Sequence, residues 1–186
     1  MTLKLVSFKA CPFVQRVAIT LQYKGIDYDI EYIDLGSPPE WFLAISPLKK
    51  VPLLIVDGTV IFESAVINEY IDEVYSPMLH PEDLLMKAIN RSWIEFCNNI
   101  SLYTFQLTIK ENKSDFKDTL EAMLNDFDLV ENYLSFSVIL PSESMTNIFL
   151  VFLWEAVAEK LTFSPDSIAT LIFFDGIYPY SDCVAI

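Results

Sequence analysis

The first 75 residues alternate short apolar runs with helical patterns, and this order limits the possible folds more than any other feature. Four segments have the pattern of short strands: residues 3–8, 28–33, 51–56 and 59–62. Three have apolar residues at helical spacing: residues 12–24, 40–45 and 63–74. The order β-α-β-α-β-β-α predicts an α/β domain in which a mixed sheet carries helices on its faces.

The residues between these segments support the same division. Pro12 suits the first position of a helix, and Gly25 suits the end of that helix. Asp57-Gly58, between two short apolar runs, is typical of a tight hairpin turn.

The second half of the chain has a different pattern. Residues 75–82 form a linker that contains two prolines, and long helical patterns without glycine follow over 83–109 and 116–134. After about residue 135 the helical period is lost. We therefore predict a first domain of residues 1–76 and an all-α domain of residues 83–186, atypical after about 135 and incomplete. An insertion, a frameshift or a truncated gene product would each explain this tail.

Composition and charge exclude several classes of protein. Hydrophobic residues make up 53% of the chain, which excludes global disorder. The formal charge of -14 repels nucleic acid and anionic lipid, so we expect neither as a partner. The most apolar stretch, residues 148–154, is too short to span a bilayer, and the first residues lack a secretory signal. The sequence thus predicts a soluble, cytoplasmic protein.

Three cysteines and one histidine are too few and too widely spaced for a disulfide framework or a structural zinc site. They fit a reducing compartment, in which each thiol is either buried or used. Cys97 follows Phe96 on a largely apolar helix, so we expect it to be packed. His80 is in the linker, so we expect it at the surface.

Cys11 differs from the other cysteines because a strand precedes it and a helix follows it. The helix dipole and the unpaired N–H groups at a helix start lower the pKa of a thiol, and Arg16 would add to this. Val14 stands where a Cys-x-x-Cys motif has its second cysteine. The site would therefore form a mixed disulfide with a small thiol. The alternative is a buried, inert cysteine.

Two further pairs of residues suit a small peptide ligand. A cis peptide at Val51-Pro52 would leave the Val51 backbone free to pair with such a ligand, and the alternative is a trans proline in an edge strand. Ser64, at a helix start, suits a carboxylate, and Glu63 suits an ammonium group. Together they suit the head group of an α-amino acid, and the alternative is a simple helix cap.

These motifs, in this order and spacing, make residues 1 to about 76 similar to the N-terminal domain of the glutathione S-transferase superfamily. The similarity is greatest to the cysteine-type, omega-like members and their bacterial relatives. The stretches that carry it are Cys11-Pro12-Phe13-Val14-Gln15-Arg16, Lys24-Gly25-Ile26, Pro39-Glu40-Trp41-Phe42, Lys50-Val51-Pro52-Leu53 and Ile61-Phe62-Glu63-Ser64-Ala65-Val66-Ile67. The resemblance implies a thioredoxin-like fold and glutathione as cosubstrate, with no metal.

The resemblance also implies a role for each matching residue. Cys11 would be the catalytic thiol. The Val51 backbone would pair with the cysteinyl part of glutathione, and Glu63 with Ser64 would hold its γ-glutamyl end. The full set of implied glutathione-binding residues is Phe13, Val51, Pro52 (in a cis peptide), Glu63 and Ser64.

Two other regions bear on the ligands. Omega-like proteins have a glutathione-binding lysine just before the Pro-Glu-Trp segment, where this chain has Pro38, and Lys49 and Lys50 lie nearby in the sequence. The sequence leaves open whether either lysine substitutes. On the first long helix, Trp93 and Tyr103 would line the acceptor-substrate site by the same resemblance, and the alternative for both is packing.

Two classes of function fit these features. In the first, a glutathione-dependent thiol transferase or reductase, Cys11 attacks a mixed disulfide or an oxidised acceptor such as dehydroascorbate, and a second glutathione releases the product. Its partners would be a small electrophile or disulfide and, by the resemblance, a second copy in a homodimer. The alternative is a non-catalytic binding or regulatory protein of the same fold, or an inactive truncated product. Cys11 with Glu63-Ser64 favours the enzyme, whereas Pro38 and the atypical tail favour the alternative.

An incomplete helical domain would expose apolar surface that further helices normally cover. We therefore expect the purified chain to behave poorly as a monomer and to form oligomers or aggregates. Size-exclusion chromatography with light scattering, followed by thermal unfolding, measures this. A monodisperse monomer with a cooperative melt would contradict the prediction.

Overall fold

The computed structural model describes residues 1–8 and 11–136, and the chain divides into two compact units, Met1–Leu79 and His80–Ile186. The predictions of a loss of helical period, an atypical tail and an incomplete second domain fall mainly outside the described residues. The domain limits of 1–76 and 83–186 stay predictions.

The first unit has the predicted order of strands and helices. Its elements are β1 (Leu3–Ser7), α1 (Pro12–Tyr23), β2 (Asp29–Tyr32), α2 (Glu40–Ile45), β3 (Leu53–Val56), β4 (Thr59–Phe62) and α3 (Ser64–Val74). The strands form one mixed sheet in the order β2-β1-β3-β4, in which β1 is parallel to β2 and antiparallel to β3. The predicted thioredoxin-like α/β fold is confirmed.

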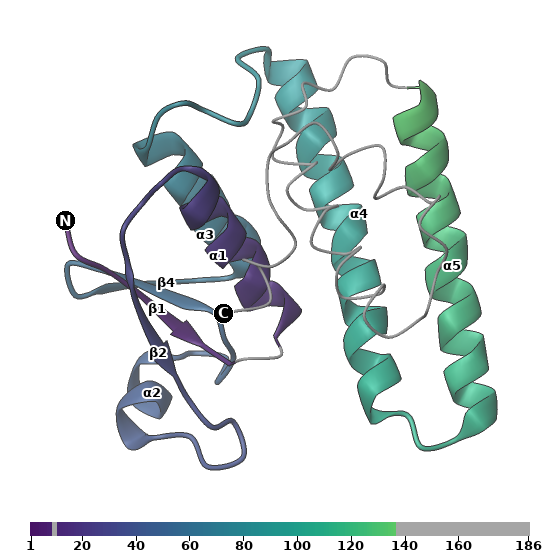
Figure 1. Ribbon diagram of the computed structural model, residues 1–186, viewed down its shortest axis with the longest axis horizontal. Helices are drawn as coiled ribbons and strands as arrows, with labels where there is room; N and C mark the ends of the chain where they lie inside the picture. Colours follow the sequence, from purple (N-terminus) through teal and green to yellow (C-terminus); the bar gives the residue numbers. More distant parts are fainter. Residues whose placement is uncertain (9–10, 137–186) are drawn as a thin grey trace. The chain divides into compact units, whose positions relative to one another are not determined.

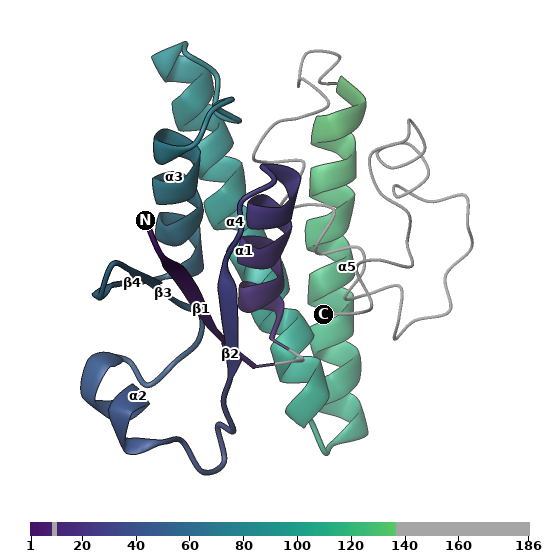
Figure 2. The same cartoon turned by 60° about the vertical axis from the view of Figure 1, so that its left-hand side comes forward.

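Two helices of this unit pack together. Figure 1 shows α1 and α3 side by side next to the sheet, and Figure 2 shows α2 set apart from both. Leu5 of β1 and Leu54 of β3 are register partners and are fully buried. Leu21 of α1 and the α3 residues Ile67 and Ile71 belong to the same contiguous core. Burial of these side chains is the main stabilising contribution to the unit.

The end of α1 is set by Gly25. Its φ of +63° lies in the left-handed region that favours glycine. The Gly25 N–H donates to the Gln22 carbonyl and the Ile26 N–H donates to the Leu21 carbonyl, each at 2.9 Å. These two bonds form a Schellman motif, which terminates the helix and leaves Lys24 at its C-cap.

The predicted hairpin turn joins β3 to β4. Asp57 and Gly58 have φ values of +46° and +86°, as a two-residue turn of type I′ requires. Thr2 donates its N–H and its hydroxyl to Asp57 Oδ1, at 2.8 and 2.9 Å. The turn is thereby tied to the start of β1.

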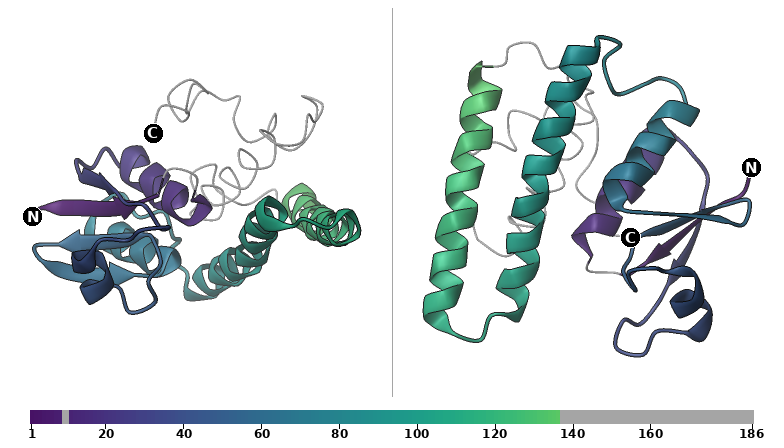
Figure 3. Two further views of the ribbon diagram at one scale, coloured as in Figure 1. Left: turned by 90° about the horizontal axis from the view of Figure 1, so that it is seen from below. Right: turned by 180° about the vertical axis from the view of Figure 1, so that it is seen from behind.

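The described part of the second unit consists of two long helices, α4 (Leu84–Ile109) and α5 (Lys113–Phe136). Trp93 stacks on Tyr133 with ring centroids 4.0 Å apart, and the Thr104 hydroxyl donates to the Met123 sulfur at 3.9 Å. An early residue of α4 thus meets a late residue of α5, so the helices are antiparallel, as Figure 3 shows. Over the described residues, neither helix has the combined length and apolar character that crossing a bilayer requires.

Two minor predictions have opposite outcomes. Cys97 is fully buried, which confirms that it is packed. His80 is only 4% exposed, so the prediction of a surface position is wrong. The segment before it is held rather than free, because the Leu79 N–H donates to Asp72 Oδ1 at 2.6 Å.

Leu54 offers a test of this core. Replacing it with alanine leaves a cavity between the sheet and its helices, so we expect the free energy of unfolding to fall by about 2–5 kcal/mol. Urea denaturation followed by far-UV circular dichroism measures the change. The control is Leu48→Ala, where the native side chain is 50% exposed, with an expected change within about 0.5 kcal/mol. Equal changes in the two variants would contradict the assigned core.

Candidate functional site

Cys11 lies at the N-cap of α1 and has extended backbone angles, φ -89° and ψ 116°. Its carbonyl accepts the N–H groups of Val14 and Gln15, both at 3.1 Å. Pro12 takes the first helical position, where a missing N–H costs nothing. The Cys-Pro sequence therefore holds the thiol at the start of a helix.

The surroundings of the thiol correct one expectation. Cys11 Sγ is partly buried and lies 4.0 Å from the Val51 carbonyl oxygen, to which it donates. Burial raises the pKa of the thiol, whereas the backbone N–H groups of Val14 and Phe13 and the charge of Arg16 lower it. The burial contribution is the largest, so the prediction of a depressed pKa is wrong. The surroundings of Cys11 in this structure therefore favour the thiol over the thiolate.

Arg16 connects the thiol region to α3. Its side chain is buried, and Nε donates to Ser64 Oγ at 2.7 Å; the terminal nitrogen Nη2 donates to the same oxygen. The guanidinium carbon lies 5.4 Å from the centroid of the Phe13 ring, within the range of a cation–π contact. The sequence pointed to Arg16 only as a neighbour of Cys11, and its bond to Ser64 was not predicted.

Val51 and Pro52 come just before β3. The predicted cis peptide between them is confirmed. Val51 is buried, and its carbonyl is the group that Cys11 Sγ approaches. The ladder with β1 begins only at Leu53, so the Val51 backbone lies outside the sheet pairing.

The loop before Val51 presents two lysines. The Ser46 hydroxyl accepts the Lys50 N–H at 3.2 Å and donates to the Lys50 carbonyl at 3.3 Å. Lys49 has a φ of +54°, and both lysine side chains are exposed. The loop therefore places cations directly before Val51 in the chain.

Glu63 and Ser64 open α3 in different ways. Glu63 is the N-cap residue, is exposed, and has a φ of +67° with ψ of 111°, which a residue with a side chain rarely adopts. Such strained positions cluster at functional sites. Ser64 is the first helical residue and is 2% exposed. The Glu63 side chain makes no capping hydrogen bond, and Ser64 Oγ accepts from Arg16, so neither side chain caps this helix by a hydrogen bond.

The residues predicted from the sequence are thus divided between the two units. Cys11 and Val51 lie close together, and Phe13, Arg16 and Ser64 form a neighbouring group. Trp93 and Tyr103 are on α4 in the second unit, and both are half-buried. Trp93 is stacked on Tyr133. Their role in an acceptor site stays a prediction.

Metal binding has no support in the part of the chain that the structure describes. Residues 1–8 and 11–136 contain no group of three or more histidine, cysteine, aspartate or glutamate side chains placed to hold a metal ion. The chemistry of the site is that of a thiol, a guanidinium, backbone groups outside the sheet ladder and a helix N-terminus.

Comparison with known proteins gives a consistent result. The family described as glutathione S-transferase, N-terminal domain, matches residues 10–74. Mouse (Mus musculus) glutathione S-transferase omega-1 is 33% identical over 140 residues, which cover 72% of this chain and 58% of that protein. The chain spans just over half the length of the omega-1 relatives that it matches.

Two solved structures share the fold. A glutathione transferase from Methylococcus capsulatus has a TM-score of 0.81 at 21% identity, covering 99% of this chain and 98% of that one. A glutathione S-transferase from Methylobacillus flagellatus, solved with glutathione bound, has a TM-score of 0.75 at 21% identity, covering 87% and 85%.

Arg16→Met tests the electrostatics of the thiol. The Arg16 charge lowers the pKa of Cys11, so its removal should raise that pKa further and slow alkylation by iodoacetamide at pH 8.5 by about two- to tenfold. In the unaltered chain the rate should still be rising above pH 9.0, the ordinary pKa of a cysteine. Mass spectrometry of the Cys11 peptide gives the rate. Arg91→Met, on exposed α4 surface, is the matched control, and equal rates in the two folded variants would refute the assignment.

Proposed function

The chain belongs to the glutathione S-transferase superfamily, and from this premise we propose that it is a glutathione-dependent thiol transferase whose reacting atom is Cys11 Sγ. One observation carries the proposal. The thiol is at a helix N-terminus, 4.0 Å from the carbonyl of Val51, a residue whose backbone is outside the sheet ladder. A cysteinyl peptide that paired with Val51 would bring its own sulfur to Cys11.

The remaining parts of glutathione fit the groups around this point. Its γ-glutamyl carboxylate suits the N–H groups of the first turn of α3 and the Ser64 hydroxyl. Its ammonium suits the exposed carboxylate of Glu63, whose strained backbone holds it at the helix start. Its glycyl carboxylate suits Lys49 or Lys50. Either side chain would replace the glutathione-binding lysine that omega-like proteins have at the position of Pro38. Phe13 and Pro52 would complete the contact surface.

The chemistry is disulfide exchange in two steps. The Cys11 thiolate attacks the glutathione sulfur of a mixed disulfide, a bond forms between Cys11 and glutathione, and the acceptor leaves as a thiolate that takes up a proton. The thiolate of a second glutathione then attacks the Cys11 mixed disulfide, which releases glutathione disulfide and restores Cys11. Glutathione is oxidised and the acceptor is reduced. We propose small disulfides and electrophiles as the acceptors. Trp93 and Tyr103 are the proposed acceptor-site residues. The proposed protein is cytoplasmic and forms a homodimer.

A non-catalytic glutathione-binding protein of the same fold is the second candidate. The raised pKa of Cys11 favours it, because a protonated thiol is a weak nucleophile. Pro38, in place of a lysine, also favours it. Such a protein would bind glutathione without turning over a disulfide.

Cys11→Ser separates these functions. We expect it to abolish reduction of a small glutathione mixed disulfide, because the serine hydroxyl cannot form the intermediate. Turnover is measured with glutathione and a coupled reductase, and binding by calorimetry. Cys97→Ser, at a buried thiol of the second unit, is the control and should keep most of the activity.

Three results are informative. Turnover in the unaltered chain that is lost in Cys11→Ser supports the transferase. Binding of glutathione by a folded chain without turnover supports the non-catalytic candidate. Full activity in Cys11→Ser would refute Cys11 as the reacting group.

A further inference from the structure

α1 and α3 meet along polar side chains as well as apolar ones. Three polar residues come from α1 and its C-cap, each four positions after the last: Arg16, Thr20 and Lys24. Three come from α3 at the same spacing: Ser64, Asn68 and Asp72. Residues four apart lie on one helix face. All six side chains are buried, so we call this set the polar seam.

The seam joins the two helices by polar contacts at three levels. At the Cys11 end, Arg16 Nε donates to Ser64 Oγ at 2.7 Å. In the middle, Asn68 Nδ2 and the Thr20 hydroxyl both donate to the Arg16 carbonyl, at 3.4 and 3.0 Å. At the far end, the Lys24 ammonium and Asp72 Oδ1 form an ion pair at 2.8 Å, with both side chains fully buried.

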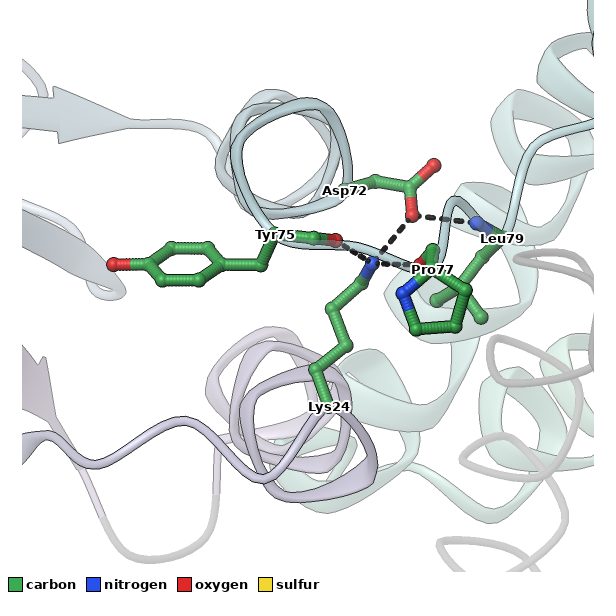
Figure 4. Close-up of polar contacts among 5 residues, drawn as sticks. All are labelled: Lys24, Asp72, Tyr75, Pro77 and Leu79. Carbon is green, nitrogen blue, oxygen red and sulfur yellow. Dashed lines mark hydrogen bonds and ion pairs between the residues drawn. The ribbon is translucent and has the colours of Figure 1, made fainter.

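Figure 4 shows the contacts of this ion pair. Lys24 Nζ also donates to the carbonyls of Tyr75 and Pro77, both at 2.6 Å. The three donors of an ammonium group therefore have three acceptors. Asp72 Oδ1 accepts the Leu79 N–H as well, at 2.6 Å. The pair thus holds α1, α3 and residues 75–79 at one point.

Apolar side chains tolerate small displacements of one helix along another, because their contacts have no direction. Buried charges do not, since separating them would leave an ion in the interior without its partner. Lys24 follows Arg16 by eight residues, and Asp72 follows Ser64 by eight. Eight helical residues span about 12 Å. A displacement of α3 at its Asp72 end therefore also moves Ser64 relative to Arg16.

We propose that Lys24 and Asp72 are positioning residues: the ion pair fixes α3 lengthwise against α1 and so sets the arrangement of Ser64 and Arg16 beside Cys11. The effect on the surroundings of Cys11 follows from the chain's own contacts. Its consequence for thiol transfer rests on the proposed function.

Lys24→Met/Asp72→Leu is the central variant. It removes both charges together, so neither is left unpaired, and such replacements often preserve the fold. Lys24→Arg keeps the charge and is the conservative variant. Lys4→Met breaks the ion pair of Lys4 with Glu31, which is partly exposed and spans 3.0 Å, and is the matched control. The readout is the pH dependence of Cys11 alkylation by iodoacetamide in the full chain, followed by mass spectrometry of the Cys11 peptide.

We expect the midpoint of Cys11 alkylation to fall by at least about half a pH unit in Lys24→Met/Asp72→Leu, a roughly threefold change in rate at fixed pH. Burial is the largest influence on this thiol, so a loosened α1–α3 contact that lets water reach Cys11 lowers its pKa. Lys24→Arg and Lys4→Met should keep the midpoint of the unaltered chain. A double variant that unfolds cooperatively and keeps that midpoint would overturn the proposal.

Asp72→Asn covers the case in which the double variant does not fold. It keeps an acceptor for the Leu79 N–H and removes only the charge, so it should shift the midpoint in the same direction, and no shift in a folded protein would overturn the proposal. Thiol transfer is assayed separately. Absence of turnover in the unaltered chain counts against the proposed function alone, because the alkylation profiles do not depend on glutathione.

Discussion

The packing of α1 against α3 is the interaction on which the candidate site depends. The thiol belongs to one helix start and Ser64 to the other, and no backbone hydrogen bond joins two helices directly. Their relative position is therefore set by side chains. Apolar residues such as Leu21 and Ile67 supply the attraction, while the polar seam from Arg16–Ser64 to Lys24–Asp72 supplies the direction. The packing of α1 against α3 therefore both stabilises the unit and sets the relative positions of Cys11 and Ser64.

Burial affects this site in two opposing ways. It brings Arg16 and the helix N–H groups close to Cys11 in a medium where their charges act strongly. It also removes water from the thiol, and this second effect is larger, so the pKa of Cys11 rises. The groups that would stabilise a thiolate are therefore in place, but the unliganded site favours the protonated thiol. The two candidate functions differ in whether that thiolate forms once glutathione is bound.

Most of the first unit could be predicted because its signals are local. The hairpin at Asp57-Gly58 needs two adjacent residues with positive φ, and the end of α1 needs one glycine at Gly25. Element ends were less certain. The apolar run over 51–56 predicted a strand from Val51, but β3 begins at Leu53, because Pro52 has no N–H to donate to a ladder.

The sequence identified which residues form the candidate site, but it could not predict how deeply each of them is buried. The order of motifs identified Cys11 and Ser64, yet the sequence could not show how much water each retains, since burial is decided by residues 40 or more positions away. Polar residues at every fourth position of two helices were a readable signal. Arg16, Thr20 and Lys24 on one helix match Ser64, Asn68 and Asp72 on the other, and two such lines at the same spacing suggest partners that face each other. Read in that way, Lys24 is a charge that must find its counterpart on α3, and the pairing of the two helices follows from it.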